Sequence, residues 1–386
     1  MYDLAVVIPT YNVAHTINYV VYQAALGLEK YFPERKSVIF VSDGGSTDGT
    51  VEVVKAFKKP IGSDIIVERY KGVLGKGSAI LHAFQRVKEM GVKALAMVDS
   101  DLRSIQPSWI YALIQPIIDG YDLVTPLYTR HKYDGTITNQ LAYPLTKTLY
   151  SVNLRQPIGG DFGLSIKLVE NLLENDFNNF INVRKFGIDI FITNMALALG
   201  YKVAQADLGT KVHEAKDPSE LESMFQNVSA TQLLIAKKHR DRWRIEKELE
   251  PVLYKACKVW RFVQPLEVDI ESNISKLKNV FKERKSLIDK YLPSKIREEV
   301  YSLIESVTVK KKPVLSPEIW AKCVYYHLAA INEQNHDSVT SSLHVLWLAR
   351  ILSFILGTLD LDHEKAEKQI RKDAEAFKAA FTEMLQ

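Results

Sequence analysis

Two aspartates that stand one residue apart, Asp99 and Asp101, are the side chains of this sequence best suited to hold a cation. They follow an apolar run, residues 94–98, that predicts a buried strand. Alternate side chains of an extended segment point the same way, so both carboxylates can converge on one object while Ser100 points away. Hard carboxylate oxygens suit Mg or Mn, and these ions commonly also hold substrate phosphates. The pattern therefore indicates a divalent-cation site, although an acidic loop with Asp101 as a cap explains it too.

A third acid, Asp43, lies in the segment VSDGGSTDGT, residues 41–50. The two glycines of this segment allow a tight turn, and Thr47 or Asp48 can cap the next helix. These needs do not explain Asp43, whose carboxylate at a strand tip could accept hydrogen bonds from the N–H edge of a nucleobase. Neither the dinucleotide fingerprint nor the P-loop pattern occurs, so the segment predicts a nucleotide site of another kind.

Gly75, Lys76 and Gly77 precede a predicted helix that Ser78 opens. Backbone N–H groups at a helix start and a lysine beside them suit a diphosphate. A flexible loop with a solvated lysine explains this segment equally well.

The elements that would position these side chains alternate between strand and helix patterns. Residues 4–8, 38–41, 65–67 and 94–98 read as strands, with helical spacing between them. Such alternation predicts an α/β fold with a mostly parallel sheet and helices on both faces. Ligands of these sheets bind outside the carboxyl ends of the strands. The most distinctive polar residues fall at those ends, in residues 9–11, 42–44 and 99–101.

Taken together, VVIPTYN, SDGGSTDGT, GKG and VDSD resemble, in this order and spacing, the nucleotide-sugar-dependent glycosyltransferases of the type A fold. The resemblance implies a Rossmann-like mixed sheet, with Asp43 holding uracil or guanine and Lys76 approaching the base or the diphosphate. It implies that Asp99 and Asp101 form the metal motif, with Asp101 binding the metal most directly. The sugar nucleotide would contact Pro9, Thr10, Tyr11, Asp43, Gly75, Lys76, Asp99, Ser100, Gln156, Gly159 and Gly160.

Three later segments resemble the retaining enzymes that make compatible solutes, the mannosylglycerate synthases and the glucosyl-3-phosphoglycerate synthases. They are RQPIGGDFGLS (155–165), FGIDIFIT (186–193) and LGTKVHEA (208–215). Asp161 stands where that family usually has Glu, and Asp189 matches its Gly-Ile-Asp pattern. His213 matches the family's third metal ligand, and a His with two carboxylates suits Mn slightly better than Mg. Without the resemblance, His213 reads as a surface histidine beside Lys211 and Glu214.

The acceptor loop of mannosylglycerate synthase resembles residues 129–140, TRHKYDGTITNQ. The resemblance implies that Arg130 and Thr138 hold the carboxylate and hydroxyls of glycerate, and the Arg fork matches two carboxylate oxygens. With His131 and Lys132 the loop is also basic enough for a phosphate, so 3-phosphoglycerate stays open as acceptor. Residues 320–328 and 343–351 weakly resemble the C-terminal helices of mannosylglycerate synthase, which favours that group.

The implied reaction is a metal-dependent transfer, with retention, of mannose or glucose from a nucleoside-diphosphate sugar to D-glycerate or 3-phosphoglycerate. The acceptor hydroxyl would attack from the face that the diphosphate leaves, with Asp101, Asp161 and Asp189 as the catalytic residues and no proton donor from the protein. Asp161 and Asp189 are the carboxylates near enough to act as nucleophiles, but we expect them to hold sugar or acceptor hydroxyls. Gly159 and Gly160 let the backbone approach the sugar, and Gly160 also the acceptor. GDP-mannose, UDP-glucose, ADP-glucose and GDP-glucose all remain possible donors.

The composition bears on three properties: nucleic-acid binding, the state of the cysteines and membrane insertion. Among 386 residues, 50 Lys and Arg face 46 Asp and Glu, which is too even for a nucleic-acid binder. Two cysteines, Cys257 and Cys323, make no disulfide framework, so reduced thiols in the cytoplasm are expected. The most apolar late segment, residues 343–359, is shorter than the roughly 20 residues of a spanning helix, so no membrane span is expected.

Residues 1–225 are predicted to form the catalytic domain, with a nucleotide-sugar half at about 1–103 and an acceptor half at about 104–225. Residues 226–386 read as α-helical and nearly free of glycine. We expect them to pack on the catalytic domain or to form the interface of a homodimer.

Two other functions fit parts of the pattern. One is a transferase of the same fold that acts on a lipid phosphate or a polysaccharide. The other is a non-catalytic protein that binds nucleotide sugars or serves as a scaffold, although the intact set Asp99, Asp101 and His213 argues against it.

Overall fold

The structure, a computed structural model, describes residues 1–57, 62–213, 217–244, 247–312 and 315–385. The chain divides into two compact units, each built from three stretches of sequence. Unit 1 contains residues 1–130, 154–214 and 250–264, and unit 2 contains residues 131–153, 215–249 and 265–386.

Unit 1 is built on a sheet that has eight strands among the described residues, in the order β3-β2-β1-β4-β6-β5-β7-β8. Only β6 runs antiparallel to its neighbours, so the prediction of a mostly parallel α/β sheet is confirmed. The strands are β1 Leu4–Thr10, β2 Ser37–Asp43, β3 Asp64–Arg69, β4 Ala94–Met97, β5 Leu123–Thr129, β6 Phe162–Ser165, β7 Val203–Thr210 and β8 Val252–Lys255.

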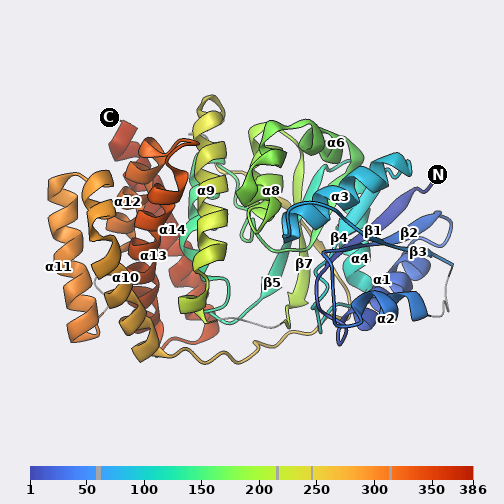
Figure 1. Ribbon diagram of the computed structural model, residues 1–386, viewed down its shortest axis with the longest axis horizontal. Coiled ribbons are helices and arrows are strands. Elements are labelled where there is room, and N and C mark those ends of the chain that lie inside the picture. The colour runs from blue at the N-terminus through green and yellow to red at the C-terminus, as the bar shows by residue number, and fades with distance from the viewer. Residues whose placement is uncertain (58–61, 214–216, 245–246, 313–314, 386) are drawn as a thin grey trace. The chain divides into compact units, whose positions relative to one another are not determined.

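Helices cover both faces of this sheet (Figure 1). Alternate residues of β1 point to opposite faces, and Leu4, Val6 and Ile8 pack in one apolar core with residues of α1 and α4. Helix α3 contacts β1 and β2, and it also packs with α6 and α8. The helices of unit 1 are α1 Ile17–Tyr31, α2 Thr50–Ala56, α3 Lys76–Glu89, α4 Pro107–Ile118, α6 Ile166–Glu174, α7 Ile181–Arg184 and α8 Ile188–Ala198, with the 3-10 turn η2 Asp176–Asn179.

The direction of β6 decides which loops can meet. Its first residue, Phe162, pairs with Met97, the last residue of β4. The residues just before β6 therefore lie beside the carboxyl end of β4. Strands β1, β2, β5 and β7 run parallel to β4 or to one another, so their carboxyl ends lie at this same end of the sheet. The ends of these five strands and the residues before β6 make six segments, far apart in sequence, that bring polar side chains to one end of the sheet.

Unit 2 is helical. Its long helix α13 packs against α10, α9 and α12, and α14 packs against α12 and α5. Ser316 caps α12 by accepting a hydrogen bond from Ile319 N at 3.3 Å, as its place before Pro317 predicts. The elements are η1 Thr138–Ala142, α5 Tyr143–Tyr150, η3 Pro218–Glu220, α9 Glu222–Lys238, η4 Arg240–Arg242, α10 Ile270–Tyr291, α11 Ser294–Lys310, α12 Pro317–Ala330, α13 His336–Thr358 and α14 His363–Leu385.

Helix α13 is longer than the apolar run that the sequence shows. At 23 residues it is the one helix of the described residues that is long and apolar enough to cross a membrane, with a mean hydropathy of 1.6. In its most apolar window 89% of the residues are buried, which is also what the core helix of a helical bundle shows. The absence of a membrane span therefore stays a prediction.

The division of the chain differs from the predicted boundary at residue 225 in three segments. Residues 131–153 and 217–225 belong to unit 2, and residues 250–264 return to unit 1, where β8 pairs with β7. Strand β8 has only four residues, and three of them are exposed. Its sequence therefore lacks the alternation that identifies a half-buried strand.

Candidate active site

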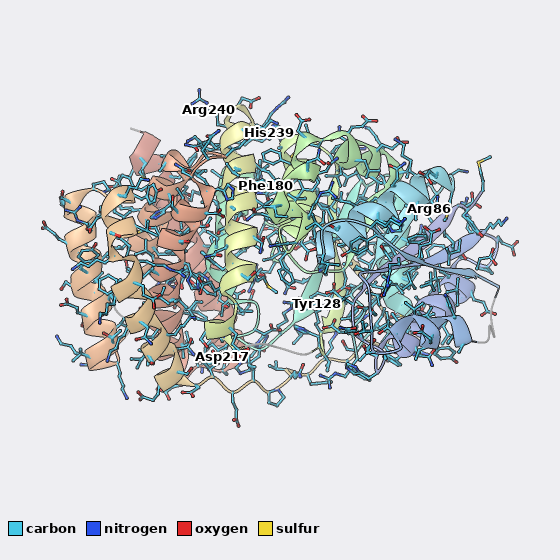
Figure 2. All side chains as sticks on the ribbon, in the orientation of Figure 1. Arg86, Tyr128, Phe180, Asp217, His239 and Arg240 are labelled. Carbon is cyan, nitrogen blue, oxygen red and sulfur yellow. The ribbon has the colours of Figure 1, made fainter. Side chains whose placement is uncertain are left out.

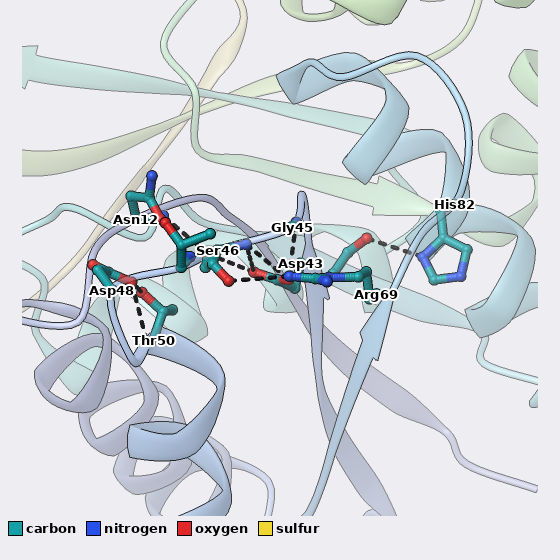
Figure 3. A network of polar contacts seen from close by, with 10 residues as sticks. Asn12, Asp43, Gly45, Ser46, Asp48, Thr50, Arg69 and His82 are labelled. Atoms are coloured by element: carbon teal, nitrogen blue, oxygen red, sulfur yellow. Dashed lines mark hydrogen bonds and ion pairs between the residues drawn. The ribbon is translucent and has the colours of Figure 1, made fainter.

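The predicted nucleotide end of the site is a closed turn around Asp43. The Asp43 carboxylate is fully buried and accepts hydrogen bonds from Gly45 N at 2.9 Å and from Ser46 Oγ at 2.6 Å. It also pairs with Arg69 Nε at 3.3 Å (Figure 3). Asp43 therefore stabilises its own loop, a role that the sequence pattern did not reveal. Its contact with a base stays a prediction.

The loop after β1 is bound to the same turn. Asn12 N donates to Ser46 Oγ at 2.9 Å, and Thr47 N donates to Asn12 Oδ1 at 2.9 Å (Figure 3). Asp48 accepts from Ala14 N at 3.0 Å, and this bond together with Thr50 lowers the pKa of Asp48. Hydrogen bonds thus hold the loops after β1 and β2 together.

Of the three residues predicted to line the nucleoside pocket, Pro9 and Thr10 are buried. The Thr10 hydroxyl donates to Ile8 O at 3.3 Å. Tyr11 is 59% exposed, so its ring is the part of this trio open to a base.

A cluster of opposite charges lies at the ends of β4 and β7. We call Lys76, Asp99, Asp161, Asp189 and Lys211 the charged cluster. Two ammonium groups face three carboxylates there, and Asp99 stands between both lysines. The cations beside Asp99 in the structure are therefore lysines.

Lys76, in the first turn of α3, joins two of the predicted acids. Its Nζ lies 2.9 Å from Asp99 Oδ1 and 3.2 Å from Asp189 Oδ2. The glycine after it is needed for packing, because a Cβ on Gly77 would lie 1.8 Å from Val183 O. The approach of Lys76 to the base or the diphosphate of a sugar nucleotide stays a prediction.

Lys211, one residue beyond β7, is the most deeply buried cation of the cluster at 4% exposure. Its Nζ lies 2.9 Å from Asp99 Oδ2, 3.0 Å from Asp161 Oδ2 and 2.8 Å from Gly159 O. A lysine has three N–H donors, so these contacts use all of them.

Asp161 is held from several sides. Its Oδ1 accepts from Asp99 N at 2.8 Å, and the hydroxyl of Tyr128 donates to Oδ2. Tyr128, which is labelled in Figure 2, lies on β5 and pairs with Gly209 of β7. Burial and the neighbouring Asp161 raise the pKa of Tyr128 well above its usual value, so this hydroxyl keeps its proton.

Burial opposes every charge in the cluster, and the partners decide which charges persist. Burial alone would raise the pKa of Asp99, but Lys211 and Lys76 outweigh it and hold the pKa below the ordinary range. Burial raises the pKa of Asp161 against the attraction of Lys211, and that of Asp189 against Lys76. Although burial works against them, the carboxylates raise the pKa of both lysines. Asp99 and the lysines therefore stay charged.

Asp189, in the first turn of α8, has one oxygen without a partner. Its Oδ2 pairs with Lys76, whereas Oδ1 is buried and accepts no hydrogen bond from the described part of the chain. A buried acceptor of this kind costs free energy unless it meets a donor. Asp189 Oδ1 is therefore placed to accept a hydroxyl group.

The glycines and the glutamine of the 156–161 segment serve its own packing. Gln156 accepts from Tyr128 N at 3.3 Å and donates to Tyr128 O at 3.0 Å, so it extends the hydrogen bonding of β5. Gly160 has a φ of +87°, and a Cβ there would lie 2.1 Å from Asp99 Oδ2. In the same way, a Cβ on Gly159 would lie only 2.0 Å from the side chain of Pro126. Contacts of these residues with a sugar stay predictions.

The predicted metal ligands are present but are not preassembled. Asp101 is half-buried, and its carboxylate has no ion-pair or hydrogen-bond partner within the described ranges. Both oxygens of Asp99 bind lysines. No group of three His, Cys, Asp or Glu side chains that could hold a metal occurs in the described residues. The donor types nevertheless suit Mg or Mn, with Asp101 as the available oxygen ligand and His213 as an expected one.

The predicted acceptor residues fall in different units, Arg130 in unit 1 and Thr138 in unit 2. The Arg130 guanidinium lies over the Tyr128 ring at 4.9 Å, and its buried Nε has no partner in the described residues. Thr138 begins the π-helical turn η1 and is 4% exposed. π-helical turns often mark functional positions.

Lys132 does not have the free ammonium group that the acceptor loop suggested. Its Nζ donates to the carbonyl oxygens of Thr358, Leu359 and Leu361 at 2.6, 3.1 and 2.7 Å. It thereby caps the C-terminus of α13, where a cation is favoured. The basic character available for a phosphate in this loop is therefore reduced to Arg130 and His131.

Sequence reasoning did not identify Lys211, Tyr128 and Arg69 as parts of the candidate active site. The sequence shows Lys211 only as a neighbour of His213, and lysines are mostly exposed in proteins. No signal in the sequence distinguishes an exposed Lys211 from a buried one. Tyr128 gave a weak one, since it lies two residues before Arg130 on a strand that ends at the site.

Comparison with known proteins identifies a family for part of this chain. Residues 5–170, which run from the second residue of β1 through β6, match the model of the family described as Glycosyl transferase family 2. The chain is a glycosyltransferase. Together with the sheet order, the match shows the type A fold that the sequence predicts.

Two curated relatives of this glycosyltransferase are glucosyl-3-phosphoglycerate synthases. The one from Mycolicibacterium smegmatis is 27% identical over 246 residues, which cover 60% of this chain and 76% of that protein. The one from Mycolicibacterium paratuberculosis is 26% identical over 214 residues, which cover 50% of this chain and 62% of that protein. The likeness is therefore confined to part of each chain.

Solved structures of glucosyl-3-phosphoglycerate synthase from Mycobacterium tuberculosis are also similar. One, in complex with Mn²⁺, UDP and phosphoglyceric acid, is 24% identical with a TM-score of 0.47 and covers 60% of this chain and 78% of that chain. Another, with Mn²⁺, UDP-glucose and phosphoglyceric acid, is 23% identical with a TM-score of 0.47 and covers 63% and 82%.

Proposed function

We propose that this glycosyltransferase moves a hexose, with retention, from a nucleoside-diphosphate sugar to a hydroxyl of 3-phosphoglycerate or D-glycerate. The observation that carries the proposal is Asp189. Its buried Oδ1 meets no donor among the residues that the structure describes, while Lys76 holds its other oxygen beside Asp99. A sugar or acceptor hydroxyl would satisfy that oxygen. The names of the curated relatives support the same reaction.

We propose UDP-glucose as the first donor to test, because the curated relatives are named glucosyl-3-phosphoglycerate synthases. GDP-mannose, GDP-glucose and ADP-glucose follow. The exposed Tyr11 ring offers a stacking face for the base. Lys76 and the start of α3 offer positive charge to the diphosphate.

On the acceptor side, Arg130 supports a small carboxylate or phosphate. Its Nε is buried and has no partner in the described part of the chain, and an arginine fork binds two oxygens of such a group. Because Lys132 is used as a cap, the loop supplies less positive charge than its sequence suggests. Thr138 is proposed to hold an acceptor hydroxyl.

We also propose that Asp101, Asp99 and His213 hold Mg or Mn. The ion would offset the charge that develops on the departing diphosphate. In the chain itself, Asp189 orients the hexose, Arg130 orients the acceptor, and Tyr128 keeps Asp161 in place. None of these roles needs a protein proton donor. We propose a cytoplasmic enzyme without a membrane span, which forms a homodimer and binds no nucleic acid.

The test is a matrix of the four donors against D-glycerate, 3-phosphoglycerate and a lipid phosphate, with Mg and Mn, read by mass spectrometry. We expect one hexose to be added to glycerate or 3-phosphoglycerate with retained anomeric configuration. Transfer only to the lipid phosphate would replace the acceptor class. Metal-dependent binding of UDP without any transfer would indicate a non-catalytic binder instead.

A further inference from the structure

Lys211, in the loop after β7, contacts two other loops at the carboxyl ends of the strands, where the candidate active site lies. Asp99 follows β4, whereas Gly159 and Asp161 precede β6. The Lys211 ammonium binds an oxygen of each of these residues within 3.0 Å. These contacts are buried, because Lys211 is only 4% exposed. One side chain thus ties the loop after β7 to the loop after β4 and to the segment before β6, which the pairing of β4 with β6 already places side by side.

The arrangement around Lys211 leaves little room for the carboxylates to move. Asp99 N donates to Asp161 Oδ1, and the Tyr128 hydroxyl donates to Asp161 Oδ2. The Lys211 ammonium also lies 5.1 Å from the centre of the Tyr128 ring. Gly160 presses against Asp99, since a Cβ would lie 2.1 Å from Asp99 Oδ2. Removing the ammonium would leave two carboxylates facing each other at this point.

We infer that Lys211 is a positioning residue, an internal cation that orients Asp99 and Asp161 toward the sugar nucleotide and competes with a divalent cation for Asp99. The inference rests on the proposed function for its catalytic part. Its competition with a cation rests on geometry alone, because Asp99 Oδ2 cannot bind an ammonium group and a metal at full strength together. Lys211 itself is not proposed to contact substrate.

Four proteins test the inference: the unaltered chain, Lys211→Met, Lys211→Arg and the double variant Lys211→Met with Asp161→Asn. Lys93→Met serves as the matched control, because Lys93 pairs with Asp3 at the surface. Near-UV circular dichroism and thermal unfolding first establish which variants are folded. If Lys211→Met does not fold, the double variant, which removes the unpaired buried carboxylate, is used in its place.

In the transfer reaction we expect Lys211→Met to lose about 100-fold or more in kcat while both KM values stay within about threefold, as misplaced groups do. Lys211→Arg should recover at least about one tenth of the activity, because a guanidinium can also pair with both carboxylates. A kcat within about threefold of the unaltered chain in Lys211→Met would overturn the inference. So would full recovery of kcat in the double variant, since Lys211 would then only neutralise Asp161.

Titration with Mn²⁺ alone, by calorimetry, separates this inference from the proposed function. Loss of the competing ammonium should tighten Mn²⁺ binding by about tenfold or more in Lys211→Met, and Lys93→Met should bind as the unaltered chain does. Unchanged or weaker binding in Lys211→Met would overturn the inference. If the unaltered chain transfers no hexose at all, the proposed function fails, and this titration still decides the role of Lys211.

Discussion

At the scale of single residues, the motif at the end of β4 places two aspartates in very different surroundings. Asp99 is bound by two lysines, whereas Asp101 has no such partner in the described part of the chain. The sequence predicts that the pair holds a cation, but the structure shows that only one of the two side chains is available without rearrangement. The two acids should therefore respond differently to substitution.

Asp101→Ala should reduce turnover by about 100-fold or more, because it removes the most available metal oxygen. The melting temperature should change by less than about 2 °C, because no partner is lost. Asp337→Ala, which removes an exposed carboxylate of unit 2, is the control with the same change in charge. Near-normal activity with excess Mn²⁺ would show that the metal is bound elsewhere.

Arg130→Ala should raise the KM of the acceptor by about tenfold or more and leave that of the donor nearly unchanged. Arg130→Lys keeps the charge but lacks the fork, so it should recover only part of the loss. Steady-state kinetics with the acceptor and donor varied in turn measures both effects. An unaltered acceptor KM would move the acceptor site away from Arg130.

Part of this site was accessible from the sequence, and part was not. Asp99, Asp101 and Lys76 stand at strand or helix ends, where a pattern of short apolar runs predicts them to converge. The pairing of Lys211 with Asp161 depends on β6 running antiparallel, and no local pattern encodes that direction. Likewise, only coordinates reveal that Lys132 caps α13, because its partners lie more than 220 residues away.

At the scale of elements, α3 shows how a glycine pair can serve packing as well as ligand binding. The start of α3 approaches residues 183–185 so closely that Gly77 N donates to Lys185 O at 3.0 Å. The sequence indicated a helix start at Ser78, but the helix begins at Lys76, which puts the lysine in its first turn. The close approach is what fixes that position.

Gly77→Ala should destabilise the protein by roughly 2 kcal/mol or more, because its Cβ would overlap Val183 O and the backbone must shift. Gly62→Ala is the control, since a Cβ there meets nothing within 4 Å. It should change the free energy of unfolding by less than about 0.5 kcal/mol. Denaturant unfolding of both variants measures the difference, and equal stability would refute the packing role.

At the scale of the whole molecule, unit 2 contains two buried histidines that make stability depend on pH. Burial lowers the pKa of both His327 and His344 to about 4. His327 is neutral in its hydrogen bonds, with Nδ1 facing Cys323 O at 2.7 Å and Nε2 facing Ser342 Oγ at 2.8 Å. The unfolded chain therefore takes up protons first as pH falls.

The free energy of unfolding should fall as pH drops below about 6.5, the ordinary value for an unfolded histidine, and should level off near pH 4. Each histidine contributes at most about 3 kcal/mol to this loss of stability, because a pKa shift of one unit is worth about 1.4 kcal/mol. His327→Gln should flatten this dependence, whereas His15→Gln, at an exposed site, should not. A dependence that is identical in His327→Gln and the unaltered chain would contradict the assignment.

The interleaved division of the chain has a consequence for how the molecule is made. The sheet of unit 1 acquires its edge strand β8 only from residues 252–255, after most of unit 2's α9 has already been synthesised. A ribosome must therefore release residues of both units before either can close. Cutting the gene at the end of β7 would yield fragments with unpaired strand edges, which invite aggregation.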